Sequence, residues 1–162
     1  MIFITGGSYQ GKTEFAISLY KKINGPENEP VLLNAQDLLT AAKSGSGINT
    51  DTGNDCANCG AEGGEDCSGF IEEIRGADII TGFHLLVRYC LERKKDPYKL
   101  ADMILKEVPG AVIISNEIGC GIVPADKFER EWREAAGRMS CRLAASADEV
   151  YRVFCGIGQR IK

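Results

Sequence analysis

The stretch that decides the fold is IFITGGSYQGKT, residues 2–13. Residues 6–13 match the pattern G-x-x-x-x-G-K-[ST] in full. An apolar run over residues 2–5 precedes the pattern, and a helical pattern over residues 12–22 follows it. Glycines let the main chain curl so that several N–H groups point into one hollow, and a helix N-terminus adds partial positive charge. The stretch therefore predicts a strand, a phosphate-binding loop and a helix.

Two side chains of this loop are expected to act on a nucleoside triphosphate. Lys12 supplies a positive charge for the β- and γ-phosphates, and the Thr13 hydroxyl is suited to Mg²⁺. The rest of the loop is predicted to cradle the phosphates, and it consists of Gly6, Gly7, Ser8, Tyr9, Gln10 and Gly11. Kinases, hydrolases and motor proteins share this pattern, so it predicts phosphate binding without fixing the reaction.

Short apolar runs alternate with helical patterns along the 162 residues. The predicted strands cover residues 2–5, 30–34, 77–81, 111–115, 149–154 and, at an edge, 159–162. The predicted helices cover residues 12–22, 36–43, 85–93, 98–107 and 126–147. This alternation predicts a single α/β domain over 1–162, with a mostly parallel sheet and helices on both faces.

Composition and charge narrow the class of protein. The net charge of −4 leaves no chain-wide basic field for a nucleic acid. No apolar run approaches the roughly 20 residues that span a bilayer, and no basic segment precedes the first apolar run. The seven cysteines are an odd number in a chain without signs of secretion. We expect a cytoplasmic protein that has reduced thiols, no membrane span and no nucleic acid partner.

Residues 44–69 form a Cys- and Gly-rich loop with seven glycines and almost no apolar residue. Cys56 and Cys59 have C-x-x-C spacing, and Cys67 follows them. Three interpretations of these cysteines stay open: a Zn²⁺ site, an iron–sulfur cluster, or free or redox-active thiols. A fourth ligand is open as well, with Cys90, His84, Asp55 and Asp66 as candidates. The remaining cysteines are expected to be small buried residues, namely Cys90, Cys120, Cys141 and Cys155.

Polar residues follow the apolar run over residues 111–115. Glu117 and Asn116 would lie at the carboxyl end of that strand, where ligands gather in open α/β sheets. Glu117 is the candidate acid near the metal, and Asn116 could hold Glu117 or a ligand oxygen. The alternative is an acid in a solvated loop.

The last third of the chain carries a recognisable signature. Residues 115–124 read SNEIGCGIVP and resemble the family pattern T-N-E-V-G-x-G-I-V-P. Residues 136–138, 142–145, 147–150 and 156–162 resemble the segments that follow that pattern. With residues 6–13, this resembles the adenosylcobinamide kinase/adenosylcobinamide-phosphate guanylyltransferase family of cobalamin biosynthesis. The likeness is dense over residues 111–162 and clear over residues 1–23.

The resemblance implies a RecA-like P-loop fold, a homo-oligomer and two reactions. One reaction phosphorylates the aminopropanol hydroxyl of adenosylcobinamide with GTP or ATP. The other transfers GMP from GTP to that phosphate through a GMP–histidine intermediate. Arg138 matches the family's Gly-Arg, so it is a candidate for contact with a phosphate or an adjacent subunit. The other arginines of its helix, Arg130, Arg133 and Arg142, are expected on a solvated face with glutamate partners.

The chain departs from the family pattern at two places. The family's histidine segment has no counterpart, because residues 35–70 contain no histidine, and His84 is the sole histidine of the chain. The strand over residues 77–81 ends in Thr81, where the family has an acid. We therefore predict the kinase reaction and leave guanylyl transfer open, with His84 as its candidate nucleophile. The alternative is a non-catalytic, regulatory P-loop homologue with a metal- or redox-sensitive cysteine loop.

Overall fold

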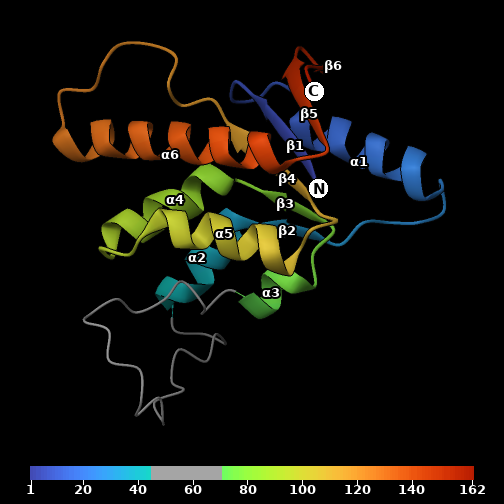
Figure 1. Ribbon diagram of the computed structural model, residues 1–162, viewed down its shortest axis with the longest axis horizontal. Coiled ribbons are helices and arrows are strands. Elements are labelled where there is room, and N and C mark those ends of the chain that lie inside the picture. Colours follow the sequence, from blue (N-terminus) through green and yellow to red (C-terminus); the bar gives the residue numbers. More distant parts are fainter. Residues whose placement is uncertain (45–70) are drawn as a thin grey trace, which may run out of the picture.

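The computed structural model describes residues 1–44 and 71–162, which form a six-stranded sheet with helices on both faces (Figure 1). The strands are β1 (Ile2–Gly6), β2 (Leu32–Asn34), β3 (Ile79–Thr81), β4 (Val112–Asn116), β5 (Glu149–Phe154) and β6 (Ile157–Arg160). The helices are α1 (Lys12–Asn24), α2 (Ala35–Ser44), α3 (Ile71–Arg75), α4 (Phe83–Glu92), α5 (Pro97–Glu107) and α6 (Lys127–Ser146). The predicted α/β class is confirmed.

The strands lie in the order β2-β3-β4-β1-β5-β6. All neighbouring pairs are parallel except β5 and β6, which are antiparallel. The strand that leads into the phosphate loop, β1, is therefore central, between β4 and β5. This mostly parallel sheet has a P-loop NTPase fold, as the sequence predicted.

Successive residues of β1 supply the two cores of the molecule. Ile4 packs with Ala16 on the face that α1 covers. Phe3 packs with Leu86 and Met139 on the opposite face, which α4, α5 and α6 cover (Figure 1). This alternation is the period of two of a β-strand, and consecutive apolar residues such as those at 2–4 are typical of a strand that is covered on both faces.

Helix starts follow local capping chemistry. Asp126 accepts a hydrogen bond from the main-chain N–H of Glu129 at 2.9 Å and so caps the start of α6. Asp96 caps α5 in the same way, with Pro97 in the first turn. Gly82 precedes α4 in the left-handed conformation, so the helix begins at Phe83, two residues before the predicted start.

The expectation of buried cysteines is wrong for three of the four. Cys90 is buried in the core, but Cys120, Cys141 and Cys155 are exposed. Cys120 lies in the loop after β4, and Cys155 lies in the β5–β6 turn with a φ of 50°. Cys141 lies on the outer face of α6, because only one stripe of a helix faces the core.

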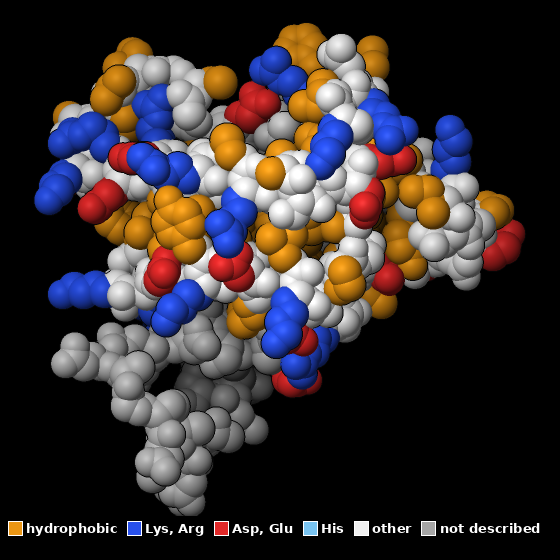
Figure 2. Space-filling model, viewed as in Figure 1, with side chains coloured by type: hydrophobic (Ala, Val, Ile, Leu, Met, Phe, Trp, Pro, Cys, Tyr) orange, Lys and Arg blue, Asp and Glu red, His pale blue; other side chains and the backbone are white. Residues whose placement is uncertain are grey.

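Charged side chains of both signs are mixed over the molecular face shown in Figure 2. Within the described ranges 1–44 and 71–162, none of the helices is long and apolar enough to cross a bilayer.

Candidate functional site

The phosphate loop, residues 6–13, joins β1 to α1 at the carboxyl edge of the sheet. A hollow of about 520 Å³ opens beside it. The loop side of the hollow is lined by Tyr9, Gln10, Gly11, Lys12 and Thr13. The sheet side is lined by Thr81, His84, Ile114 and Asn116. Five of the eight predicted loop residues and Asn116 therefore lie around one space, of a size that suits a small-molecule ligand. Gly6, Gly7 and Ser8 do not line it.

Two glycines of the loop are required by close main-chain contacts. A Cβ on Gly6 would lie 2.3 Å from the carbonyl oxygen of Val153 in β5. A Cβ on Gly11, whose φ is +76°, would lie 3.1 Å from the Cα of Gly156. The loop is thus pressed against β5 and the β5–β6 turn, and side chains at these two positions would push it away.

The β5–β6 turn also holds the loop by hydrogen bonds to Gln10. The main-chain N–H of Gly156 donates to the carbonyl oxygen of Gln10 at 2.9 Å. The main-chain N–H of Cys155 donates to the side-chain oxygen Oε1 of Gln10 at 2.7 Å. Gln10 is predicted from the sequence as a phosphate-binding residue, but its side-chain contact with Cys155 could not be predicted, because that partner lies 145 residues away.

Lys12 is the buried cation of the site. Its side chain folds over the loop, and its Nζ donates to the carbonyl oxygen of Gly7 at 2.5 Å. Burial lowers the pKa of Lys12, and the carboxylate of Glu117 opposes this shift. An ammonium held in a partly desolvated loop, at the start of a helix, is suited to bind a polyphosphate.

Glu117 lies directly after β4, as predicted. Its main-chain N–H donates to the carbonyl oxygen of Gly6 at 3.0 Å, which ties it to the start of the loop. Its carboxylate forms an ion pair with Arg152 of β5, with 3.1 Å between Oε2 and Nη2. Sequence analysis missed Arg152, which the parallel register of β1 and β5 places beside Thr5 near the same edge.

His84 is brought to the hollow by the first turn of α4. The imidazole is 6% exposed, and its Nδ1 lies 3.3 Å from the main-chain nitrogen of Asn116. Its Nε2 lies 3.2 Å from the side-chain nitrogen Nδ2 of Asn116. Burial, and after it the charge of Lys12, lowers the pKa of His84 to about 4. The ring is therefore neutral at physiological pH.

Arg130 and Arg142 of α6 are exposed, as predicted, and Arg133 is half-buried, but their partners are not the predicted glutamates. Arg142 pairs with Asp102 of α5, with 2.7 Å between Nε and Oδ1. Arg133 donates to the carbonyl oxygen of Ile122 at 2.7 Å, and Arg130 donates to that of Ala125 at 2.6 Å. Both guanidinium groups therefore hold the loop between β4 and α6, because the first turns of the helix face that loop. Arg138 is exposed and pairs with Glu134 at 2.7 Å, so its predicted contact with a phosphate or a second subunit stays a prediction.

Of the two predicted metal sites, the cysteine site lies outside the described residues and the Mg²⁺ site at Thr13 lies within them. Cys56, Cys59 and Cys67 lie outside the described residues, as does nearly all of the loop at 44–69. In residues 1–44 and 71–162, there is no group of three or more His, Cys, Asp or Glu side chains that could hold a metal ion. Thr13 lines the hollow and stays the predicted Mg²⁺ ligand.

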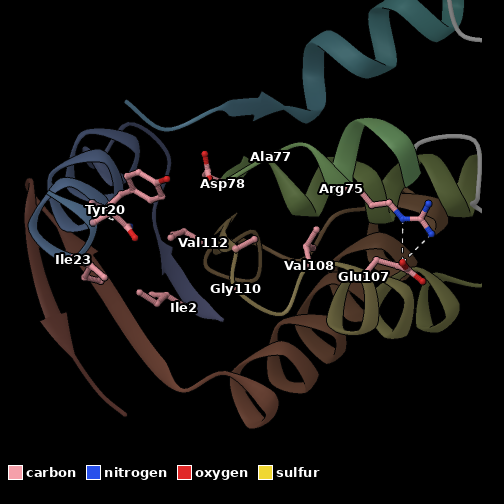
Figure 3. Close-up of a pocket in the computed structure, with 12 residues that line it drawn as sticks. Ile2, Tyr20, Ile23, Arg75, Ala77, Asp78, Glu107, Val108, Gly110 and Val112 are labelled. Carbon is pink, nitrogen blue, oxygen red and sulfur yellow. Dashed lines mark hydrogen bonds and ion pairs between the residues drawn. The ribbon is translucent and has the colours of Figure 1, made fainter. Parts of the chain in front are cut away.

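A second cavity, of about 360 Å³, lies at the amino ends of β1, β3 and β4 (Figure 3). At one end Arg75 and Glu107 form an ion pair with 2.9 Å between Nη2 and Oε2, and at the other Tyr20 lies near Asp78 (Figure 3). Ligands of open α/β sheets gather at the opposite, carboxyl edge. The hollow beside the phosphate loop is therefore the candidate functional site.

A curled glycine-rich loop between a central parallel strand and a helix, with a buried lysine, places the molecule in the class of P-loop NTPase folds. Similarity to known proteins points to one family within this class. Residues 84–161, just under half of the chain, match the model of the family described as cobinamide kinase / cobinamide phosphate guanyltransferase. The carboxyl-terminal part of the chain is therefore similar to that family, which confirms the resemblance seen in the sequence.

Two curated proteins support the same assignment. The bifunctional adenosylcobalamin biosynthesis protein CobU of Salmonella typhimurium is 53% identical over 51 residues, which are 32% of this chain and 28% of that protein. The protein of the same name from Escherichia coli is 49% identical over 51 residues, with the same shares. The match thus spans little more than a quarter of each relative. The phosphate loop lies outside the family match, so its assignment rests on its motif and geometry.

Proposed function

We propose that this chain binds a nucleoside triphosphate with Mg²⁺ at the hollow and phosphorylates the hydroxyl of adenosylcobinamide. The observation that carries the proposal is the buried Lys12 inside a complete phosphate loop, in a chain whose residues 84–161 match the cobinamide kinase family. GTP and ATP are both candidate donors. A cytoplasmic location and a homo-oligomer stay predictions.

The proposal assigns roles to four residues of the site, Lys12, Thr13, Glu117 and Asn116. Lys12 and the main-chain N–H groups hold the phosphates and stabilise charge on the transferring group. The Thr13 hydroxyl would hold Mg²⁺, which supplies charge neutralisation for the phosphate oxygens when bound. Mg²⁺ takes most of its ligands from phosphate and water, so one hydroxyl with Glu117 nearby is a sufficient protein contribution. Asn116 would contact a ligand oxygen from the end of β4.

The loop after β4 supports an acceptor that is large and partly apolar, as a corrinoid is. Ile122 is 96% exposed and Val123 is 69% exposed in this loop. Arg133 holds the main chain behind them. The loop begins at Glu117, directly beside the phosphate loop, so its apolar side chains would meet an acceptor close to the reacting phosphate.

The small number of free acids in the site favours a second candidate function. The end of β3 presents Thr81 to the hollow, where the resemblance implies an acid, and Arg152 already pairs with Glu117. A site with few free carboxylates supports a homologue that binds nucleotide as a regulator without transferring phosphate.

A direct assay separates the two functions. The protein is incubated with Mg²⁺, adenosylcobinamide and GTP or ATP labelled at the γ-phosphate, and label in the corrinoid is measured. The kinase proposal predicts transfer that Lys12→Ala abolishes and that Lys22→Ala, at the exposed far end of α1, leaves intact. Nucleotide binding without any transfer would reject the kinase and support the regulator.

A further inference from the structure

We propose that His84 is a positioning residue: a neutral imidazole that fixes the Asn116 side chain against Ser8 of the phosphate loop. The role is exerted through Asn116, so His84 would touch neither nucleotide nor acceptor. The inference rests on the proposed function only as far as nucleotide binding, and its tests do not require phosphate transfer.

The hydrogen bonds of His84 define its tautomer. The main-chain N–H of Asn116 can only donate, and it points at Nδ1 over 3.3 Å. Nδ1 is therefore the acceptor nitrogen of the ring, and the single proton of the neutral ring is on Nε2. Both ring nitrogens therefore lie close to the same residue, Nδ1 to the main-chain nitrogen of Asn116 and Nε2 to its side-chain amide.

This tautomer orients the Asn116 amide. Nε2–H is a donor, so the side-chain atom 3.2 Å from it must be the amide oxygen for a hydrogen bond to form. The same amide position lies 3.4 Å from the Oγ of Ser8, whose hydroxyl can then donate to that oxygen. His84 thus sets which end of the amide faces the phosphate loop.

The surroundings of His84 hold the ring in place. The indole Nε1 of Trp132 donates to the main-chain carbonyl oxygen of His84 at 2.7 Å. The two rings are stacked, with 6.2 Å between centroids and 17° between planes. The positive charge of Lys12 lies on the other side of the site and disfavours an imidazolium. A buried neutral ring with both nitrogens within 3.3 Å of Asn116 is placed to orient a neighbour and is poorly placed to attack a phosphate.

The contacts of Asn116 join two elements of the site, the end of β4 and the phosphate loop. Asn116 ends β4 and pairs in register with Gly6, the first residue of the phosphate loop. The contact with Ser8 adds a side-chain link between the same two elements. Loss of the link would loosen Ser8 and the neighbouring main-chain N–H groups, and nucleotide affinity would fall.

Nitrogen-15 NMR tests the tautomer directly. His84 is the sole histidine of the chain, so ring-labelled histidine gives one pair of ring nitrogens without ambiguity. We expect a protonated Nε2 and an unprotonated Nδ1 at neutral pH. In Asn116→Ala the Nε2 resonance should move more than the Nδ1 resonance, because the main-chain donor to Nδ1 remains. A protonated Nδ1 or an imidazolium would overturn the proposal. An Nε2 resonance that stays unchanged in Asn116→Ala would overturn it as well.

Binding of Mg–GTP and Mg–ATP tests the positioning role. His84→Leu removes both hydrogen bonds, and we expect it to raise the Kd roughly tenfold, as for a lost buried hydrogen bond. His84→Gln keeps an acceptor and a donor on a side chain of similar reach, so it should recover most of that affinity. Equal loss in both variants would reject positioning. A phosphorus–nitrogen adduct on His84 would also reject it and would support a nucleophile. If the leucine variant fails to fold, the NMR result and the glutamine variant still decide.

Discussion

Lys12 and His84 are two basic side chains buried at the same edge of the sheet, and burial lowers the pKa of both. They differ in the charge that they carry. Lys12 has the Glu117 carboxylate to raise its pKa again and its Nζ donates to Gly7, so it stays the cation of the site. His84 has the cation Lys12 as its neighbour and is neutral.

The buried His84 predicts a pH dependence of stability. The unfolded chain has the ordinary imidazole pKa of 6.5, whereas the pKa in the fold is about 4. Between these values the unfolded state binds more protons, so the free energy of unfolding falls as the pH falls. We expect the His84 contribution at pH 5 to be about 2 kcal/mol below that at pH 7.5.

Denaturant unfolding at the two pH values measures this contribution. Carboxylates titrate in the same window, so the comparison is with His84→Gln, which keeps them and removes the imidazole. The wild type should lose about 2 kcal/mol more than the variant on going to pH 5. Equal losses would show that His84 has an ordinary pKa in the folded protein.

The residues of the site differ in how far the sequence predicts them. Lys12 and Thr13 belong to a local motif whose geometry follows from eight consecutive residues. The burial of His84 depends on Asn116, 32 residues away, and on Trp132, 48 residues away. No local pattern carries such partners. The roles of Arg152 and Arg133 were missed for the same reason.

At the scale of elements, the β5–β6 turn acts as a support for the phosphate loop. It contacts Gln10 twice, through Cys155 and Gly156. The turn lies between the predicted strands over residues 149–154 and 159–162, but nothing in the sequence joins residue 10 to residue 155. Only the parallel pairing of β1 with β5 brings them together.

Removal of the Gln10 side chain tests this support. Gln10→Ala leaves the Cys155 N–H without its acceptor, and we expect nucleotide affinity to fall roughly fivefold, as for about 1 kcal/mol. The matched control is Gln159→Ala on exposed β6, which should bind as the wild type does. Isothermal titration with Mg–GTP gives both values. Unchanged affinity in Gln10→Ala would show that the turn does not support the loop.

Two glycines make a matched pair for testing packing. A Cβ on Gly158 of β6 would lie 2.1 Å from the ring of Phe15 in α1, whereas a Cβ on Gly137 of α6 meets nothing within 4 Å. Gly158→Ala should destabilise the protein by about 1–3 kcal/mol through overpacking. Gly137→Ala should stabilise it by roughly 0.5–1 kcal/mol, because alanine is the better helix former.

Denaturant unfolding of both variants checks the sign of each change. A neutral Gly158→Ala would mean that the Phe15 ring moves aside freely, so that β6 does not pack tightly on α1. A destabilising Gly137→Ala would mean that this face of α6 is covered by something else.

At the scale of the whole molecule, the site is assembled from distant parts of the chain. The phosphate loop comes from the first 13 residues, and Asn116 and Glu117 come from the end of β4. Residues 84–161, which match the cobinamide kinase family, contribute β4, α6, β5 and β6. The family match therefore covers the walls and supports of the hollow, and the motif supplies the phosphate cradle.

The alternation of apolar runs and helical patterns predicted the α/β class and the type of each main element, because both depend on local periodicity. The strand order did not follow from it. The placement of β4 between β1 and β3 is a long-range pairing, which neither propensity nor periodicity specifies. That placement decides which residues meet at the hollow, so the neighbours of Lys12 could not be predicted from its motif.

Titration of the protein with Mg–GTP and Mg–ATP tests the central claim, that the phosphate loop holds a nucleoside triphosphate. We predict saturable binding by the wild type and by Lys22→Ala, and its loss in Lys12→Ala. Ligand at 100 times its Kd should also stabilise the wild type by about 2.7 kcal/mol. The absence of binding to either nucleotide, or identical binding by Lys12→Ala, would contradict the claim.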